Sequence, residues 1–347
     1  MNRMSDEGAL SFYRAPRAPS YGLGGRTGPA ARPTEREGGP VEAGQLQATG
    51  RAVRPILIPT PALWADLAVL GIALVWGASY PIAKDALREA PVLVLIFYRF
   101  LVTAVVMAAV ARRDLARAPV PDLARGALLG GILFLIFLAE TAGVARTSAT
   151  NTAVIISLCT VFTPLLDYGL AGRRPPALVL LGAALACAGV GLLAGGVSAL
   201  SAGDLLVLVA AGLRAVMVVA TKRLMAGRCL TAAALTATQA ASVCLLALVL
   251  LLDPSDPAAL VVRADGRFWA AVGFLSLFCT IAAFYVQNAA LRRTSPTRVG
   301  FLMGTEPLFG FALAHILLAE PLSPLSVLGA GLTLTGTFVG LAAESRS

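Results

Sequence analysis

The chain has 347 residues, of which 57% are hydrophobic and only 14% are charged, and its mean hydropathy is +0.79. A soluble domain carries about 25% charged residues, so this chain has too little polar surface to cover a soluble core. We therefore expect an all-α integral membrane protein. The net charge of +9 is assigned to the loops that fix membrane orientation, and no nucleic-acid partner is expected.

The first 60 residues differ in composition from the rest. They are rich in Gly, Pro, Ala and Arg and have no apolar periodicity. Such a segment buries too little apolar surface to offset the entropy that ordering costs, so residues 1–60 are predicted to be a disordered cytoplasmic tail. The segment lacks the apolar stretch of a cleaved signal peptide.

Ten apolar runs follow, each close to the roughly 20 residues that an α-helix needs to cross a bilayer. Because a chain in lipid must satisfy its own backbone hydrogen bonds, all ten are predicted to be helices. The predicted spans are 64–83, 91–111, 124–145, 149–171, 175–194, 203–221, 230–252, 268–290, 297–319 and 323–343.

Lys and Arg are unevenly divided between the two sets of links. One set, with the C-terminus, carries 13 of them, and the opposite set carries five. Cytoplasmic loops hold the excess of Lys and Arg, so the first set and both termini are predicted to be cytoplasmic. We expect a multi-pass protein of the cell (inner, cytoplasmic) membrane.

The apolar region repeats one pattern. Asp66-Leu67 opens the first half, residues 64–194, and aligns without gaps to Asp204-Leu205 in the second half, residues 203–343. Each half has five predicted spans, an odd number, so the second half enters the membrane from the opposite side. Inverted repeats are typical of alternating-access transporters, whose substrate binds near the midplane between the halves.

Two further motifs recur. An Arg-Thr-Ser turn, at Arg146 and again at Arg293, leads into a span that contains Pro164 or Pro307. A glycine-rich helix then closes each half, and its glycines are predicted to permit close helix packing, either within one chain or in a homodimer. These glycines are Gly182, Gly189, Gly329 and Gly336.

The order of these motifs resembles EamA-type transporters of the drug/metabolite transporter (DMT) superfamily, over about residues 64–343. The matching pieces are Trp76-Gly77-Ala78-Ser79-Tyr80-Pro81, Arg99-Phe100, both Arg-Thr-Ser turns, Glu306-Pro307 and Leu318-Ala319-Glu320. The resemblance implies ten transmembrane helices in two inverted five-helix EamA repeats. It also implies a secondary active transporter (permease) that moves a small organic metabolite or drug, with export as the expected direction and with coupling to protons or a counter-substrate.

The chain departs from the family pattern in two places. The first half lacks the Gly-Glu that usually closes its fourth span, and Arg214 stands in the sixth span where an apolar or aromatic residue is usual. Arg214 therefore indicates either an unusual substrate or a local salt bridge.

Charged groups inside membrane spans are costly and usually functional, and three of them lie well inside their predicted spans. Glu306 precedes Pro307, which tends to kink the helix, so this carboxylate is a candidate to bind a cationic group or a coupling proton. Arg99 and Arg214 are candidates to bind an anionic group. The alternative is that Glu306 pairs with Arg99 or Arg214 and only fixes helix packing.

Other candidates are weaker. Trp76 and Tyr80 are rings that can stack on a ring-shaped substrate, although such residues more often only pack, and Gln239 is the neutral counterpart of Arg99. Gln287 and Asn288 are expected to line an outer gate together with Glu140. The predicted helix breaks are at Pro81, Pro164 and Pro307.

Enzymatic activity is not expected. The chain has one histidine, His315, no HExxH, no nucleotide-binding loop with lysine and no cysteine pattern typical of metal sites, so no catalytic residue, metal or cofactor is predicted. A non-transporting membrane component that handles lipid or assists assembly is the alternative function, because a fold alone does not fix function. The expected partners are the lipid bilayer and a small-molecule substrate.

Overall fold

The computed structural model describes residues 61–147, 149–193, 201–252, 265–318 and 323–346, and all regular structure in these ranges is helical. The predicted disordered tail, residues 1–60, lies outside the described residues. So does the side chain of His315.

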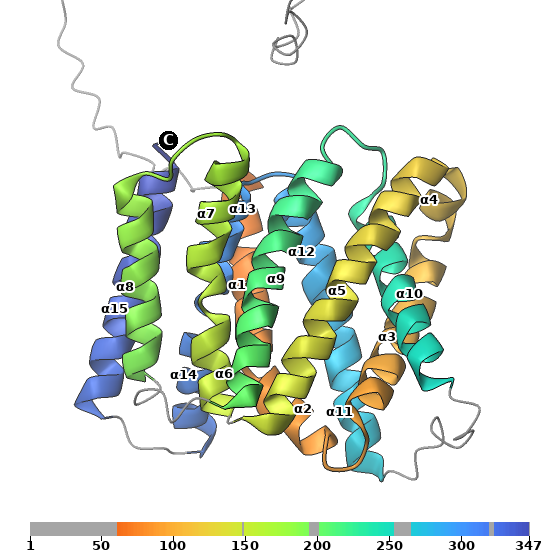
Figure 1. Cartoon of the computed structure of the whole chain (residues 1–347), viewed down its shortest axis with the longest axis horizontal. Helices are drawn as coiled ribbons and strands as arrows, with labels where there is room; N and C mark the ends of the chain where they lie inside the picture. Colours follow the sequence, from red (N-terminus) through yellow and green to blue (C-terminus); the bar gives the residue numbers. More distant parts are fainter. Residues whose placement is uncertain (1–60, 148, 194–200, 253–264, 319–322, 347) are drawn as a thin grey trace, which may run out of the picture. The chain divides into compact units, whose positions relative to one another are not determined.

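The helices follow the predicted apolar runs, and several runs are divided into two helices (Figure 1). In chain order they are α1 (Pro61–Gly77), α2 (Ser79–Ala86), α3 (Val92–Val110), α4 (Arg112–Arg117), α5 (Val120–Arg146), α6 (Ala149–Ile156), α7 (Cys159–Leu170), α8 (Ala177–Leu193), α9 (Ala202–Leu224), α10 (Ala232–Leu251), α11 (Gly266–Ser276), the π-helix η1 (Leu277–Ala282), α12 (Ala283–Leu291), α13 (Pro296–Met303), α14 (Glu306–Leu318) and α15 (Pro324–Glu344).

Eight helical segments in the described part of the chain are long and apolar enough to cross a membrane. The predicted all-helical membrane fold is therefore confirmed, but the count of ten spanning helices is not. The predicted fifth span forms α8, which has only 17 residues. The predicted ninth span is divided into α13 and α14, and each piece alone is too short to cross.

Proline explains two of the divisions. A proline ring clashes with the carbonyl four residues earlier and lacks the N–H that this carbonyl would accept. Pro81 thus disrupts the turn at Gly77, where α1 ends, and Pro307 disrupts the turn at Met303, where α13 ends. Pro164 lies inside α7, and the division between α6 and α7 comes earlier in that run.

The two glycine-rich helices, α8 and α15, pack against each other along their length (Figure 1). A Cβ atom placed on Gly182 would lie 2.7 Å from the carbonyl oxygen of Gly336, and one on Gly189 would lie 2.7 Å from that of Gly329. All four predicted packing glycines therefore meet within one chain. Because early residues of α8 face late residues of α15, the two helices are antiparallel, as an inverted repeat requires.

Helices of the first half pack mainly against helices of the second. The pairs α5 with α9 and α3 with α10 have extensive contacts, and α1 packs against α12, α13 and α14. The two ends of the bundle differ in charge. We call the end that carries Lys222, Arg292 and Arg346 the basic end, and the end that carries Lys84 and Arg146 the opposite end.

Candidate functional site

Three charged side chains from three helices meet in the interior. Arg214 of α9 donates through Nε and Nη2 to the two carboxylate oxygens of Glu140 in α5, at 3.1 Å each. Its Nη1 donates to Oε2 of Glu306 in α14 at 3.3 Å. The side chains of Arg214, Glu140 and Glu306 are 12%, 11% and 3% exposed. This central cluster joins the two halves, because Glu140 comes from the first half and the other two residues from the second.

The central cluster is not neutral when all three groups are ionised, because two carboxylates share one guanidinium. The two-point contact with Glu140 is the stronger type of Arg–carboxylate pairing, whereas Glu306 receives a single, longer contact. Burying charge is costly unless each charge is paired. Glu306 is thus the member of the cluster whose charge is least compensated.

The Tyr80 hydroxyl and the Glu306 carboxylate are neighbours and interact with each other. No hydrogen bond of ordinary geometry joins them, and within the described residues the Tyr80 hydroxyl and Glu306 Oε1 are buried without a partner. Buried polar atoms nearly always have a partner in proteins, either from the chain or from water or a ligand. Glu306 and Tyr80 therefore offer an acceptor and a hydroxyl to a small polar group.

Trp76 fixes one side of the central cluster. Cζ of Arg214 lies 5.0 Å from the centroid of the Trp76 ring, which is a favourable cation–π distance. The indole Nε1 donates to the carbonyl of Cys279 at 2.8 Å, and the ring packs against Phe284. The ring is thus held by the protein, and the prediction that it stacks on a substrate stays a prediction.

Arg99 lies apart from the central cluster and has no ion-pair partner among the described residues. Its Nε donates to Oγ1 of Thr280 at 2.6 Å and its Nη2 to the carbonyl of Cys279 at 3.3 Å. Its Cζ lies 4.5 Å from the ring centroid of Phe137. Thr280 and Cys279 belong to η1, and short π-helical turns of this kind often occur at functional sites.

A small cavity of about 20 Å³ lies beside the central cluster, lined by Trp76, Phe137, Arg214, Phe284, Gln287 and Met303 among others. That volume holds about one water molecule, so this cavity is too small for an organic solute in this conformation. Gln287 is 2% exposed and its Oε1 has no partner among the described residues.

The outer gate of Glu140, Gln287 and Asn288 stays a prediction, and the structure places Glu140 and Asn288 in separate contacts. Glu140 binds Arg214 in the interior, and Asn288 lies near the C-terminus of α12, which faces the basic end. There its Nδ2 donates to Oε1 of Gln239 at 2.9 Å and to Oγ1 of Thr236 at 3.0 Å.

Two contacts that the sequence left unassigned close the ends of the bundle. At the basic end, Arg298 of α13 binds Asp66 of α1. At the opposite end, Asp204 of α9 accepts hydrogen bonds from Thr147 and Asn151. The alignment of Asp66 with Asp204 was the available signal, since equivalent residues in an inverted repeat lie at opposite ends.

These features define a multi-pass helical membrane protein whose two halves meet at a buried charged cluster. The model of the EamA-like transporter family matches residues 63–195 and, a second time, residues 201–341. The chain therefore belongs to the EamA-like transporter family, and the predicted resemblance is confirmed.

Two further comparisons agree with this assignment. An uncharacterized transporter of Archaeoglobus fulgidus is 26% identical over 284 residues, which cover 79% of this chain and 96% of the relative. A protein of known crystal structure has a similar fold, with a TM-score of 0.66 at 20% identity, over 82% of this chain and 98% of the other. At that identity the second comparison supports the fold alone.

Proposed function

We propose that this protein is a secondary active transporter that moves a small organic solute across the cytoplasmic membrane by alternating access between two inverted five-helix halves. Export is the proposed direction, and both termini are proposed to be cytoplasmic because the basic end carries most of the Lys and Arg. The observation that carries the proposal is the central cluster, since Glu140, Arg214 and Glu306 connect the two halves at a buried position.

Glu306 is proposed to be the residue that exchanges partners during transport. Its single 3.3 Å contact with Arg214 is easier to replace than the two contacts that hold Glu140. A cationic group of the solute, or a coupling proton, would supply the charge that the second carboxylate lacks. Tyr80 would hydrogen-bond the same ligand, because its hydroxyl adjoins Glu306 and makes no hydrogen bond of good geometry among the described residues.

The small volume of the cavity beside the central cluster supports the proposal that this conformation is a closed intermediate in the transport cycle. Space for about one water beside Arg214 means that solute entry requires the halves to separate at one end. The contacts at Asp66 and at Asp204 close the two ends, so one of them would break in each open state.

The test compares the culture medium of cells that produce the wild type, Glu306→Gln or Glu89→Gln at equal membrane levels, with an empty-vector control. Glu89 is exposed, so its variant is a matched control for the loss of one carboxylate. We expect a solute that accumulates with the wild type and Glu89→Gln and is at least about tenfold lower with Glu306→Gln, because one lost charge contact is worth roughly that factor.

Equal export by Glu306→Gln would reject the role of Glu306 but not transport. Media that all match the empty-vector control would reject export. Uptake into proteoliposomes under an imposed pH gradient would then decide whether the protein transports in the other direction.

A further inference from the structure

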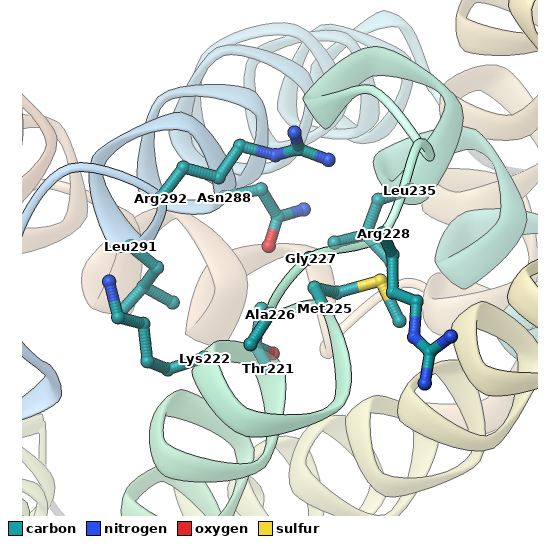
Figure 2. Close-up of a pocket in the computed structure, with 10 residues that line it drawn as sticks. All are labelled: Thr221, Lys222, Met225, Ala226, Gly227, Arg228, Leu235, Asn288, Leu291 and Arg292. Carbon is teal, nitrogen blue, oxygen red and sulfur yellow. The ribbon is translucent and has the colours of Figure 1, made fainter. Parts of the chain in front are cut away.

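A second cavity, of about 340 Å³, opens near the basic end between the end of α9, the loop to α10 and the end of α12 (Figure 2). Its volume falls in the range of small-molecule sites, roughly 300–1,000 Å³. Its lining includes Thr221, Lys222, Arg228, Asn288 and Arg292. It is thus large enough for a small organic solute, unlike the cavity beside the central cluster.

The charged side chains that line this basic pocket are all cations, and among the described residues two of them have no carboxylate within 4.0 Å. Lys222 interacts with the carboxylate of Asp167 only at longer range. Lys222 and Arg292 lie on different sides of the pocket (Figure 2), and neither has an ion pair or a side-chain hydrogen bond within the described ranges. Arg228 differs, because its Nε lies 4.0 Å from Oδ1 of Asp122 and its side chain turns away from the other two. Lys222 and Arg292 therefore provide a net positive field in the pocket.

Membrane orientation alone explains an excess of Lys and Arg at one end of a membrane protein. It does not explain buried polar atoms that lack hydrogen-bond partners. Asn288 is 1% exposed and Thr221 is 2% exposed. Asn288 Oδ1 and Thr221 Oγ1 have no hydrogen-bond partner among the described residues. Each side chain belongs to the pocket lining, so a bound molecule would satisfy atoms that the protein leaves unsatisfied.

The orientation of the Asn288 amide is fixed. Its Nδ2 donates to both Gln239 and Thr236, so Oδ1 is directed the other way, toward the middle of the pocket (Figure 2). The next residue toward the interior, Gln287, lines the cavity beside the central cluster. Adjacent residues of α12 therefore line the two cavities.

We propose that the basic pocket binds the carboxylate or phosphate group of the transported solute between Lys222 and Arg292. Asn288 Oδ1 accepts a hydrogen bond from a hydroxyl or amino group of the same molecule, and Thr221 contributes its hydroxyl. This inference rests on the proposed function and narrows the substrate to small oxyanions that also carry a hydrogen-bond donor.

The binding test uses the purified full-length protein in phosphatidylcholine nanodiscs. The thermal unfolding midpoint is followed while glycolate or inorganic phosphate replaces chloride at constant ionic strength. We expect both anions to raise the midpoint, and Arg292→Gln to weaken the apparent affinity about tenfold, as expected for one lost charge-assisted hydrogen bond. Arg293→Gln is the matched control, because Arg293 is exposed and lies outside the pocket lining.

Equal responses of Arg292→Gln and Arg293→Gln, or no response of the wild type to either anion, would overturn the inference. Anionic lipid headgroups share this chemistry, so the experiment is repeated in nanodiscs that contain phosphatidylglycerol. Arg292-dependent stabilisation by phosphatidylglycerol, with none by the soluble anions, would identify a lipid site and would also overturn the proposal.

A transport measurement separates failure of this inference from failure of the proposed function. For an exported solute, Arg292→Gln should raise the half-saturating concentration about tenfold and leave the maximal rate within about twofold, because the contact is lost in binding. Export of a solute without an oxyanion, or an unchanged half-saturating concentration in Arg292→Gln, would reject this inference but not the proposed function. If the wild type exports nothing, the proposed function fails, and the nanodisc result still decides whether the pocket binds anions.

Discussion

Arg298 holds Asp66 at the basic end through two contacts, from Nε to Oδ1 at 2.8 Å and from Nη2 to Oδ2 at 2.5 Å. Each residue has an equivalent in the other half. Asp204 corresponds to Asp66, and Asn151 corresponds to Arg298, because each lies five residues after the arginine of an Arg-Thr-Ser turn. Asn151 Nδ2 donates to Asp204 Oδ1 at 3.1 Å. One end is thus closed by an ion pair and the other by a carboxylate and neutral donors.

The first prediction concerns the ion pair at the basic end. Arg298→Ala should weaken that closure by about 1–3 kcal/mol, since hydrogen bonds to charged groups contribute about this much. Backbone amides at the start of α13 should then exchange with deuterium about tenfold faster or more, which mass spectrometry can measure. Arg293→Ala is the control, and unchanged exchange in Arg298→Ala would show that this contact does not hold the end closed.

The second prediction separates the two carboxylates of the central cluster. Glu140→Gln removes the two-point partner of Arg214 and leaves the guanidinium only its single contact with Glu306, so it should cost about 1–3 kcal/mol of folding free energy. Glu306→Gln should cost less, since either variant leaves Arg214 with one carboxylate and this one keeps the two-point contact with Glu140. Unfolding in detergent measures both, and equal losses would mean that Glu306 has a structural role.

The third prediction concerns the contact between α8 and α15. A methyl group on Gly182 would meet the backbone of Gly336 and Gly340 and would force the helices apart, so Gly182→Ala should destabilise the protein by about 1–3 kcal/mol. Gly191→Ala is the matched control in the same helix, because nothing lies within 4 Å of a Cβ there. Thermal unfolding compares the two variants, and similar midpoints would argue against backbone contact at Gly182.

The fourth prediction concerns the support of Arg99. Thr280→Val removes the side-chain acceptor of Arg99 Nε and leaves a buried donor without a partner, which should cost about 1–3 kcal/mol. Thr335→Val is the control, because Thr335 is exposed and its hydroxyl bonds only its own helix. Unfolding midpoints again compare the variants. A neutral Thr280→Val would show that the Cys279 carbonyl and the Phe137 ring suffice to hold Arg99.

Local patterns predicted much of the fold. The apolar runs gave the helices because backbone groups in lipid must bond within their own segment, and the recurring motifs indicated the family before any comparison. The division at Met303 follows from Pro307. By contrast, η1 is an ordinary apolar stretch, Leu277–Ala282, in which nothing marks a wider turn.

The candidate site was predicted only in part. The sequence predicts Glu306 and Arg214 as intramembrane charges, and their pairing is one of the two interpretations that it allows. The pairing of Glu140 with Arg214 gave no sequence signal because the two residues come from different halves, and contacts between halves depend on how helices pack rather than on spacing along one helix. The buried atoms of Asn288 and Thr221 gave no sequence signal, since only the structure shows that they lack partners among the described residues.

Arg298 and Asn151 occupy equivalent positions in the two halves, and the difference between them has a kinetic consequence. If the two halves reorient as proposed, opening each end crosses a barrier of different height, because different contacts must break. The slower of the two openings then limits turnover. Such a difference cannot by itself impose a direction of net flow, since a barrier slows the forward and reverse passage equally. The gradients of the solute and of any coupled ion alone decide which way material accumulates.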